Sequence, residues 1–157
     1  MIDLGHQPPS NAYLSAEQLL QPEHTYPLKV YVCTSCWLVQ LPAHAAADAL
    51  FTADYAYFSS TSSSWCAHAE RFVAQASRRL DLGPTSLVVE LASNDGYLLR
   101  NFVERGIGVL GIDPAPGPAA AAREAGVDTR CEFFGLEVAE KLRSEGVAAD
   151  VILSLIH

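Results

Sequence analysis

The segment from Glu90 to Tyr97 carries the side chains best suited to holding a charged small molecule. It reads Glu-Leu-Ala-Ser-Asn-Asp-Gly-Tyr and follows a short run of aliphatic residues. Ligands of parallel α/β sheets bind beyond the carboxyl ends of the strands, where loops and helix amino termini converge. Asp113 ends a second such run, 17 residues after Gly96, and this spacing suits a hydrogen bond to ribose hydroxyls. Together the two segments predict an adenosine-containing ligand.

The charge of this loop distinguishes between adenosine-containing cofactors. A dinucleotide fingerprint needs several glycines so that the backbone can approach a pyrophosphate, whereas this loop contains Gly96 alone. The carboxylates of Glu90 and Asp95 repel phosphate oxygens and attract the sulfonium and ammonium groups of S-adenosylmethionine. We therefore predict S-adenosylmethionine rather than NAD, with a ligand-free βα turn as the alternative. The predicted cofactor contacts are Glu90, Ala92, Ser93, Asn94, Asp95, Gly96, Tyr97, Asp113 and Pro114.

Cys33 and Cys36 have the spacing of metal ligands. Two thiolates so spaced can share a tetrahedral Zn²⁺, but a structural site takes four ligands. A second cysteine pair about 15–20 residues away would complete the pattern, and the sequence contains none. His24 and His44 are the nearest other candidates. The pair therefore predicts half of a zinc site, with a redox-active dithiol and two inert thiols as alternatives.

Composition limits the class of protein and its partners. The chain has 157 residues, 50% of them hydrophobic, which is enough for a buried core. Ten basic and eighteen acidic residues give a net charge of −8, which argues against binding nucleic acid through its phosphates. No apolar run reaches the roughly 18 residues of a membrane span, and the amino terminus lacks the features of a secretory signal. We expect a cytoplasmic protein with neither nucleic acid nor membrane as partner.

Three zones are predicted along the chain. Residues 1–42 are rich in proline and form a partial zinc-binding β module, in which strands 28–32 and 37–41 flank the cysteine pair. Residues 43–82 form a helical connector, whose serine run precedes a helix capped by Ser64. The apolar residues expected on one face of that helix are Trp65, Ala69, Phe72, Ala76 and Leu80.

The third zone, residues 83–157, alternates strand and helix signals. Its apolar runs are continuous, as in strands buried on both faces, so the zone predicts a parallel α/β sheet. The expected strands are 87–91, 107–112, part of 127–134 and 151–156, and the expected helices are 97–103, 119–125 and 136–142. Doubly wound order would place the last strand in the middle of a sheet. The zone is therefore expected to be the amino-terminal half of a cofactor domain.

The motifs together resemble a known family, the deoxysugar C-methyltransferases. The segments similar to the family's amino-terminal zinc module are 3–8, 26–28 and 33–41; those similar to its connector and cofactor domain are 55–69, 89–99, 111–115 and 133–135. The resemblance implies a class I methyltransferase fold with a Rossmann-like sheet. It also implies zinc, S-adenosylmethionine and a nucleotide-linked 4-keto-deoxysugar, with Tyr57, Ser59 and Ser60 near the substrate.

The implied reaction transfers a methyl group to the carbon next to the sugar ketone. The ketone acidifies that C–H bond, a base removes the proton, and the resulting enolate attacks the methyl group. The family's proposed base is a His in a Tyr-His-Glu-His stretch that has no match here, and His157 does not replace it. We assign no catalytic residue and expect an incomplete, inactive enzyme. The alternatives are a nucleotide-dependent oxidoreductase fragment and a non-enzymatic, zinc-dependent interaction module.

Overall fold

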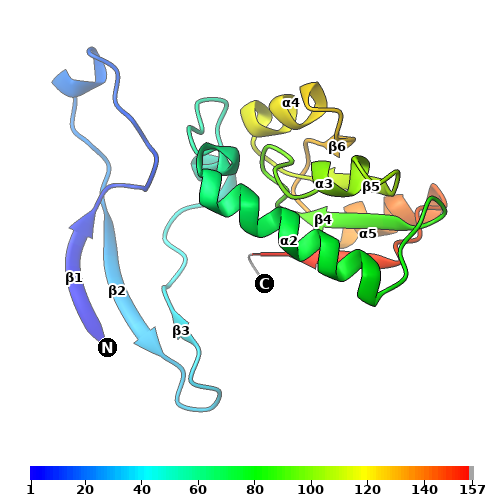
Figure 1. Ribbon diagram of the computed structural model, residues 1–157. Helices are drawn as coiled ribbons and strands as arrows, with labels where there is room; N and C mark the ends of the chain where they lie inside the picture. Colours follow the sequence, from blue (N-terminus) through cyan, green and yellow to red (C-terminus); the bar gives the residue numbers. More distant parts are fainter. Residues whose placement is uncertain (156–157) are drawn as a thin grey trace. The chain divides into compact units, whose positions relative to one another are not determined.

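The computed structural model describes residues 1–155, so Ile156 and His157 lie outside the described part of the chain. The chain divides into two compact units, Met1–Ala56 and Tyr57–His157 (Figure 1). None of the helices within the described residues combines the length and the apolar content needed to cross a bilayer.

The first unit is built on an antiparallel sheet of three strands, β1 (Ile2–Gln7), β2 (Tyr26–Val32) and β3 (Val39–Gln40), in that order. A short 3-10 helix η1 (Gln18–Leu20) and helix α1 (Ala47–Leu50) complete it. Strands were predicted on both sides of the cysteine pair, and β2 and β3 occupy these places. Strand β1 was not predicted, because its sequence shows no apolar alternation. Every residue in it is exposed, and its extended conformation comes from pairing with β2.

The second unit begins with the 3-10 helix η2 (Ser59–Thr61) and the long helix α2 (Ser63–Arg79). The predicted cap is wrong by two residues: the Ser62 hydroxyl, not that of Ser64, accepts a hydrogen bond from the Trp65 amide at 3.3 Å. A run of serines offers several equivalent caps, and the position of the first helical turn decides among them.

The apolar residues predicted on one face of α2 differ in their depth of burial. Ala69 is buried, and so is Val73, while Trp65 and Phe72 are each 38% exposed. Leu80 is exposed as well. Small side chains face the sheet because they allow the helix to approach it closely, and the large aromatic ones are displaced to its margin.

The sheet of the second unit is parallel throughout. Its strands are β4 (Leu87–Leu91), β5 (Gly108–Ile112), β6 (Thr129–Arg130) and β7 (Val151–Ser154), and their order is β6-β5-β4-β7. The connecting helices are α3 (Arg100–Val103), α4 (Pro116–Glu124) and α5 (Leu136–Ser144). This order is the 3-2-1-4 arrangement of doubly wound folds. It confirms the predicted parallel, Rossmann-like α/β fold.

Apolar layers cover both faces of the sheet. Val88 packs with residues of α2, α3 and α4, whereas Val89 points to the other face and packs with Leu142 of α5. Figure 1 shows α2 and α5 on opposite sides of β4. Both faces of β4 are covered, and accordingly all of its residues are apolar except one. The single charged residue is Glu90.

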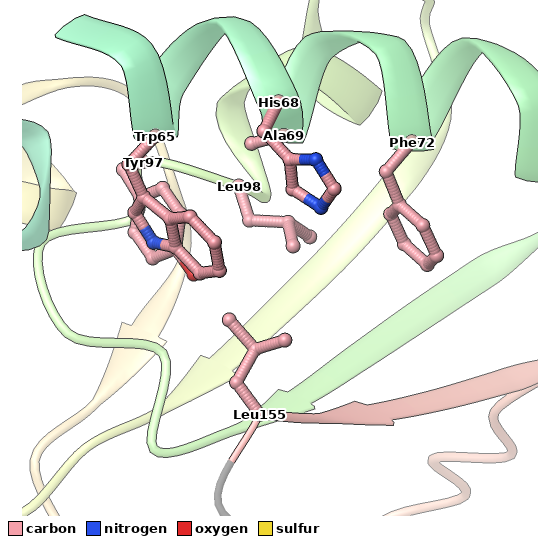
Figure 2. A pocket seen from close by; sticks show the side chains of 7 residues that line it. All are labelled: Trp65, His68, Ala69, Phe72, Tyr97, Leu98 and Leu155. Atoms are coloured by element: carbon pink, nitrogen blue, oxygen red, sulfur yellow. The ribbon is translucent and has the colours of Figure 1, made fainter. Parts of the chain in front are cut away.

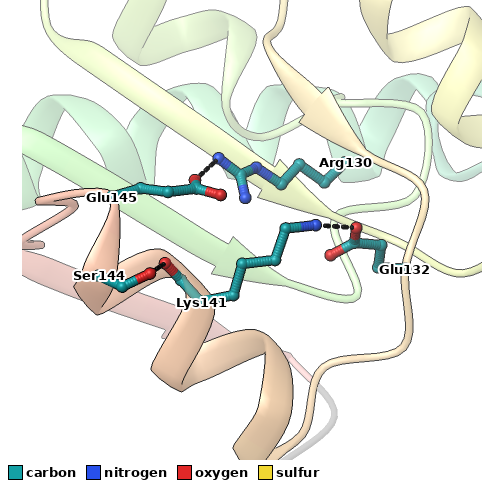
Figure 3. Close-up of polar contacts among 5 residues, drawn as sticks. All are labelled: Arg130, Glu132, Lys141, Ser144 and Glu145. Atoms are coloured by element: carbon teal, nitrogen blue, oxygen red, sulfur yellow. Dashed lines mark hydrogen bonds and ion pairs between the residues drawn. The ribbon is translucent and has the colours of Figure 1, made fainter.

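Polar contacts join α5 to the chain around β6, as Figure 3 shows. Arg130 pairs with Glu145, and Lys141 Nζ lies 2.8 Å from Glu132 Oε1. The Ser144 hydroxyl donates to the Lys141 carbonyl at 2.7 Å near the end of α5. Such exposed pairs contribute at most about 1 kcal/mol each, so the apolar layers remain the main support of the sheet.

Candidate functional site

The loop after β4 has an unusual backbone. Ala92 and Asn94 have φ angles of 58° and 51°, in the left-handed region, which costs a non-glycine residue about 1 kcal/mol or more. The amides of Ala92 and Ser93 both donate to the Ile112 carbonyl, at 2.8 and 3.3 Å, so the loop is tied to the end of β5. Backbone strain of this kind is typical of functional sites.

Gly96 closes the loop where a larger residue would not fit. Its φ is 74°, and a Cβ atom there would lie 3.0 Å from Val127 Cγ2 and 3.2 Å from Ala122 Cβ. The glycine therefore allows the turn and the close approach of α4 and the chain after it. Its role here is packing within the fold.

Asp113 anchors this loop through its carboxylate. One oxygen, Oδ2, accepts from the Asn94 amide at 2.8 Å, and the other accepts from the Ala115 amide at 2.9 Å. Burial raises the pKa of Asp113, although these two backbone bonds act in the opposite direction. Each oxygen keeps a second lone pair, so the carboxylate can still accept from a ligand hydroxyl. Pro114, next in the chain, is half-buried.

Glu90 is the most deeply buried acid at the site, with 1% of its surface exposed. Burial, together with repulsion from the Asp113 and Asp95 carboxylates, raises its pKa to about 8. Four buried side-chain oxygens of the segment from Glu90 to Tyr97 have no hydrogen-bond partner in the described part of the chain: Glu90 Oε2, Ser93 Oγ, Asp95 Oδ1 and the Tyr97 hydroxyl. Leaving such an atom unpaired costs about 1–3 kcal/mol. Four of them within eight residues indicate a place where a ligand supplies the partners.

The segment from Tyr57 to Ser60 lies directly on this loop. The Ser59 amide donates to Asn94 Oδ1 at 2.8 Å, and the Ser60 amide donates to Asp95 Oδ2 at 3.0 Å. Ser59 is buried, whereas 46% of the Tyr57 surface is exposed. The structure therefore brings the residues predicted for the cofactor together with those expected near the substrate, although about 35 residues separate them in the sequence.

A cavity of about 180 Å³ lies next to the loop, between α2 and the end of β7. Figure 2 shows the rings of Trp65, His68 and Phe72 projecting from α2 toward Leu155, with Tyr97 and Leu98 beside them. The Trp65 ring stacks on the His68 ring, with centroids 5.2 Å apart. Sequence reasoning placed Trp65 and Phe72 on one apolar face of a helix and assigned no role to His68. The spacing of the three residues along the helix was the available signal.

Cys33 and Cys36 lie in the tight turn between β2 and β3. The Cys33 amide donates to the Leu38 carbonyl at 2.9 Å, and the Trp37 amide donates to the Cys33 carbonyl at 3.0 Å. Backbone N–H groups of Cys36 and Ser35 point at the Cys33 sulfur and lower its pKa. They favour the thiolate, which is the form that binds zinc.

This turn fits two ligands of a tetrahedral zinc site and does not by itself complete one. Among residues 1–155, no three His, Cys, Asp or Glu side chains gather closely enough to hold a metal ion. His24 and His44 therefore do not join the cysteine pair in this structure.

Comparison with known proteins found sequence similarity in both units of the chain. Residues 1–51 match a family described as “Putative zinc binding domain”. The chain is 34% identical over 142 residues to C-methyltransferase NovU of Streptomyces niveus, an alignment that covers 90% of this chain. The chain is similar to this C-methyltransferase along most of its own length. It spans 34% of the length of that relative.

Two solved structures are similar to part of this chain. An RNA methyltransferase from Salinibacter ruber, in complex with S-adenosyl-L-homocysteine, is 23% identical with a TM-score of 0.35, covering 48% of this chain and 65% of that one. YjhP from E. coli is 25% identical with a TM-score of 0.32, covering 54% and 29%.

The relation to C-methyltransferases confirms the resemblance drawn from the sequence motifs. An alignment of 142 residues extends over both units of the chain, and the zinc-binding family covers the sheet that carries Cys33 and Cys36. The strained loop after β4 and the cysteine turn thus belong to one C-methyltransferase-like sequence.

Proposed function

We propose that this chain carries the cofactor-binding half of an S-adenosylmethionine-dependent C-methyltransferase. The observation that supports it most strongly is the set of buried, unpaired oxygens of Glu90, Ser93 and Asp95. Each of these atoms can accept a hydrogen bond, and two of them belong to acidic side chains. A ligand with N–H donors and positive charge fits them, as an aminoacyl sulfonium does and a phosphate does not.

Each residue of the site has a distinct task in this proposal. Glu90 and Asp95 attract the cationic part of the cofactor, and Ser93 accepts or donates at its edge. Asp113 accepts from a ribose hydroxyl while its backbone bonds hold the loop in place. When bound, S-adenosylmethionine supplies an electrophilic methyl group. The strained loop orients the cofactor before the reaction, and such alignment removes part of the entropic barrier.

We propose a nucleotide-linked keto-deoxysugar as the methyl acceptor, with Tyr57, Ser59 and Ser60 near it. Carbon is a poor nucleophile unless a neighbouring carbonyl stabilises the carbanion, so a C-methyltransferase requires an acidic C–H bond and a base. The name of the relative, C-methyltransferase, supports methyl transfer to carbon. Within residues 1–155 we assign no side chain the role of that base.

Titration calorimetry of the purified chain distinguishes this proposal from a nucleotide-dependent oxidoreductase. We expect S-adenosylhomocysteine to bind at least about tenfold more tightly than NADH, a difference of about 1.4 kcal/mol. The physical reason is that the acidic loop repels the pyrophosphate of NADH. Tighter binding of NADH would reverse the assignment.

We also propose that Cys33 and Cys36 supply two ligands of a structural zinc ion, the other two coming from the same cysteine pair in a second copy of the chain. The match of residues 1–51 to a zinc-binding family supports this, as do the N–H groups aimed at the Cys33 sulfur.

Elemental analysis of cysteine variants tests the zinc proposal. We expect zinc to co-purify with the wild-type chain and to be lost from the Cys33→Ser variant, because a hydroxyl does not replace a thiolate ligand. Cys131→Ser is the matched control, since Cys131 is an exposed thiol in the other unit, and its zinc content should equal that of the wild type. Equal zinc in both variants, or none in the wild type, would contradict the proposal.

A further inference from the structure

Asn94 uses both ends of its side chain to hold a segment far away in the sequence. Its Oδ1 accepts from the Ser59 amide at 2.8 Å, and its Nδ2 donates to the Tyr57 carbonyl at 3.1 Å. Asn94 is 8% exposed and Ser59 is 6% exposed, so the bond between them is shielded from water, and the bond to Tyr57 is partly buried. These two bonds direct the Asn94 side chain toward the segment 57–60.

The residue type at position 94 follows from two separate requirements. The side chain must accept one backbone bond and donate another, which an amide can do and an ionised carboxylate or an aliphatic group cannot. The backbone there has a φ of 51°, a conformation in which asparagine is several-fold enriched among non-glycine residues. Asparagine meets both requirements.

The two carboxylate oxygens of Asp95 have different surroundings. Its Oδ2 accepts from the Ser60 amide at 3.0 Å, while its Oδ1 is buried and has no hydrogen-bond partner in the described residues. The whole residue is 6% exposed. One oxygen therefore belongs to the segment 57–60, and the other is free for a group bound at the loop.

The far end of the segment is fixed to α2. The Thr61 hydroxyl donates to the Phe58 carbonyl at 2.8 Å, and Ser62 caps the helix through the Trp65 amide. The Cys66 thiol lies 3.6 Å from the Ser60 carbonyl. The segment is thus held between the amino terminus of α2 and the side chains of Asn94 and Asp95.

We propose that Asn94 and Asp95 are positioning residues that couple the cofactor loop to the segment 57–60. A cation bound at the free oxygen of Asp95 fixes that carboxylate, and the fixed carboxylate in turn holds the Ser60 amide. Occupation of the loop therefore orders the segment assigned to the substrate, and by linkage an ordered segment strengthens binding at the loop. This inference rests on the proposed function for the identity of the ligand, but the hydrogen bonds themselves do not.

Residue-resolved amide hydrogen exchange of the 157-residue chain tests the coupling, with S-adenosylhomocysteine as the probe. In the wild type we expect the Ser59 and Ser60 amides to be protected without ligand, and to exchange at least about fivefold more slowly with saturating ligand. In Asn94→Gly, which keeps the left-handed backbone and removes both side-chain bonds, Ser59 should exchange about tenfold faster. The further protection by ligand should also be lost.

Two more variants separate a local effect from unfolding. Asp81→Gly makes a comparable change at an exposed position of the same unit, with the same φ of 51°, and should leave Ser59 unchanged. Asp95→Asn keeps an oxygen for the Ser60 amide but loses the charge, so we expect Ser60 to stay protected without ligand and to gain nothing with it. Amides of β4 report whether each variant is folded.

The outcomes distinguish the two proposals. Unchanged Ser59 exchange in folded Asn94→Gly would overturn the positioning role. Binding of S-adenosylhomocysteine to the wild type without added protection at Ser59 and Ser60 would overturn the coupling. If the wild type does not bind the probe, the proposed cofactor and the coupling to it both fail, while the ligand-free comparison still decides whether Asn94 holds the segment.

Discussion

Glu90→Gln is expected to stabilise the folded chain at alkaline pH and, at the same time, to weaken cofactor binding. Burial and the neighbouring acids raise the pKa of Glu90 to about 8, from the ordinary value of 4.5. Between these two pH values the folded state holds a proton that the unfolded state has released. The free energy of unfolding therefore falls as the pH rises from 4.5 to 8. The raised pKa of Asp113 acts in the same direction.

Glutamine imitates the protonated carboxyl and does not titrate. The unfolding free energy of the variant should thus depend less on pH, and above pH 8 it should exceed that of the wild type by a few kcal/mol, on the order expected for a shift of this size. Urea unfolding at acidic, neutral and alkaline pH measures the difference. Glu70→Gln is the matched control, since Glu70 is exposed on α2. Parallel pH curves for wild type and Glu90→Gln would contradict the burial argument.

The same variant is expected to bind S-adenosylhomocysteine at least about tenfold more weakly at alkaline pH, because hydrogen bonds to a charged group are worth about 1.5–3 kcal/mol. In the wild type, affinity should rise with pH as Glu90 ionises, since a bound cation favours the carboxylate. Calorimetry over the same pH range tests this. Equal affinity of both proteins at every pH would show that Glu90 does not contribute to ligand binding.

Phe102→Ala is expected to cost the most stability of any single truncation in the second unit. Phe102 is the largest side chain with no exposed surface, and it packs in the layer that includes Val73 and Val88. Removing a buried phenyl ring costs about 3–5 kcal/mol, because the surrounding elements cannot close the cavity. Chemical denaturation followed by circular dichroism measures the loss.

Phe134→Ala is the matched control for this prediction. The same atoms are removed, but Phe134 is 44% exposed, so we expect a loss below about 1 kcal/mol. Similar losses for both variants would mean that the layer between α2, α3 and the sheet is not the main core of the unit.

Much of the fold was predictable because its determinants are local. Strand β4 was predicted with its observed bounds, Leu87–Leu91, because an apolar run next to helix signals is typical of a strand buried on both faces. The turn chemistry of the cysteine pair and the helical spacing in α2 are also local signals. The relation to C-methyltransferases could be drawn from motifs for the same reason, as each motif is a short string.

The features that the sequence did not predict depend on contacts between helices and strands. The apolar spacing in α2 predicted a shared face for residues such as Trp65 and Ala69 but not their depth of burial, because close approach to the sheet selects Val73 over Trp65. Strand β1 was missed because its residues gain their extended form from pairing with β2, from Ile2 opposite Val30 to Gln7 opposite Tyr26. Neither the close packing of α2 on the sheet nor the pairing of β1 with β2 can be read from the local sequence pattern.

The sequence by itself determined the chemistry available at the site: an acidic, glycine-containing turn after an apolar strand, and an acid at the end of the next. Only the tertiary structure decided how these groups are used. The titration of Glu90 depends on its burial beside Asp113 and Asp95, and the task of Asn94 depends on a segment more than 30 residues earlier. Burial and hydrogen-bond partners are properties of the folded chain, because residues distant in the sequence create them.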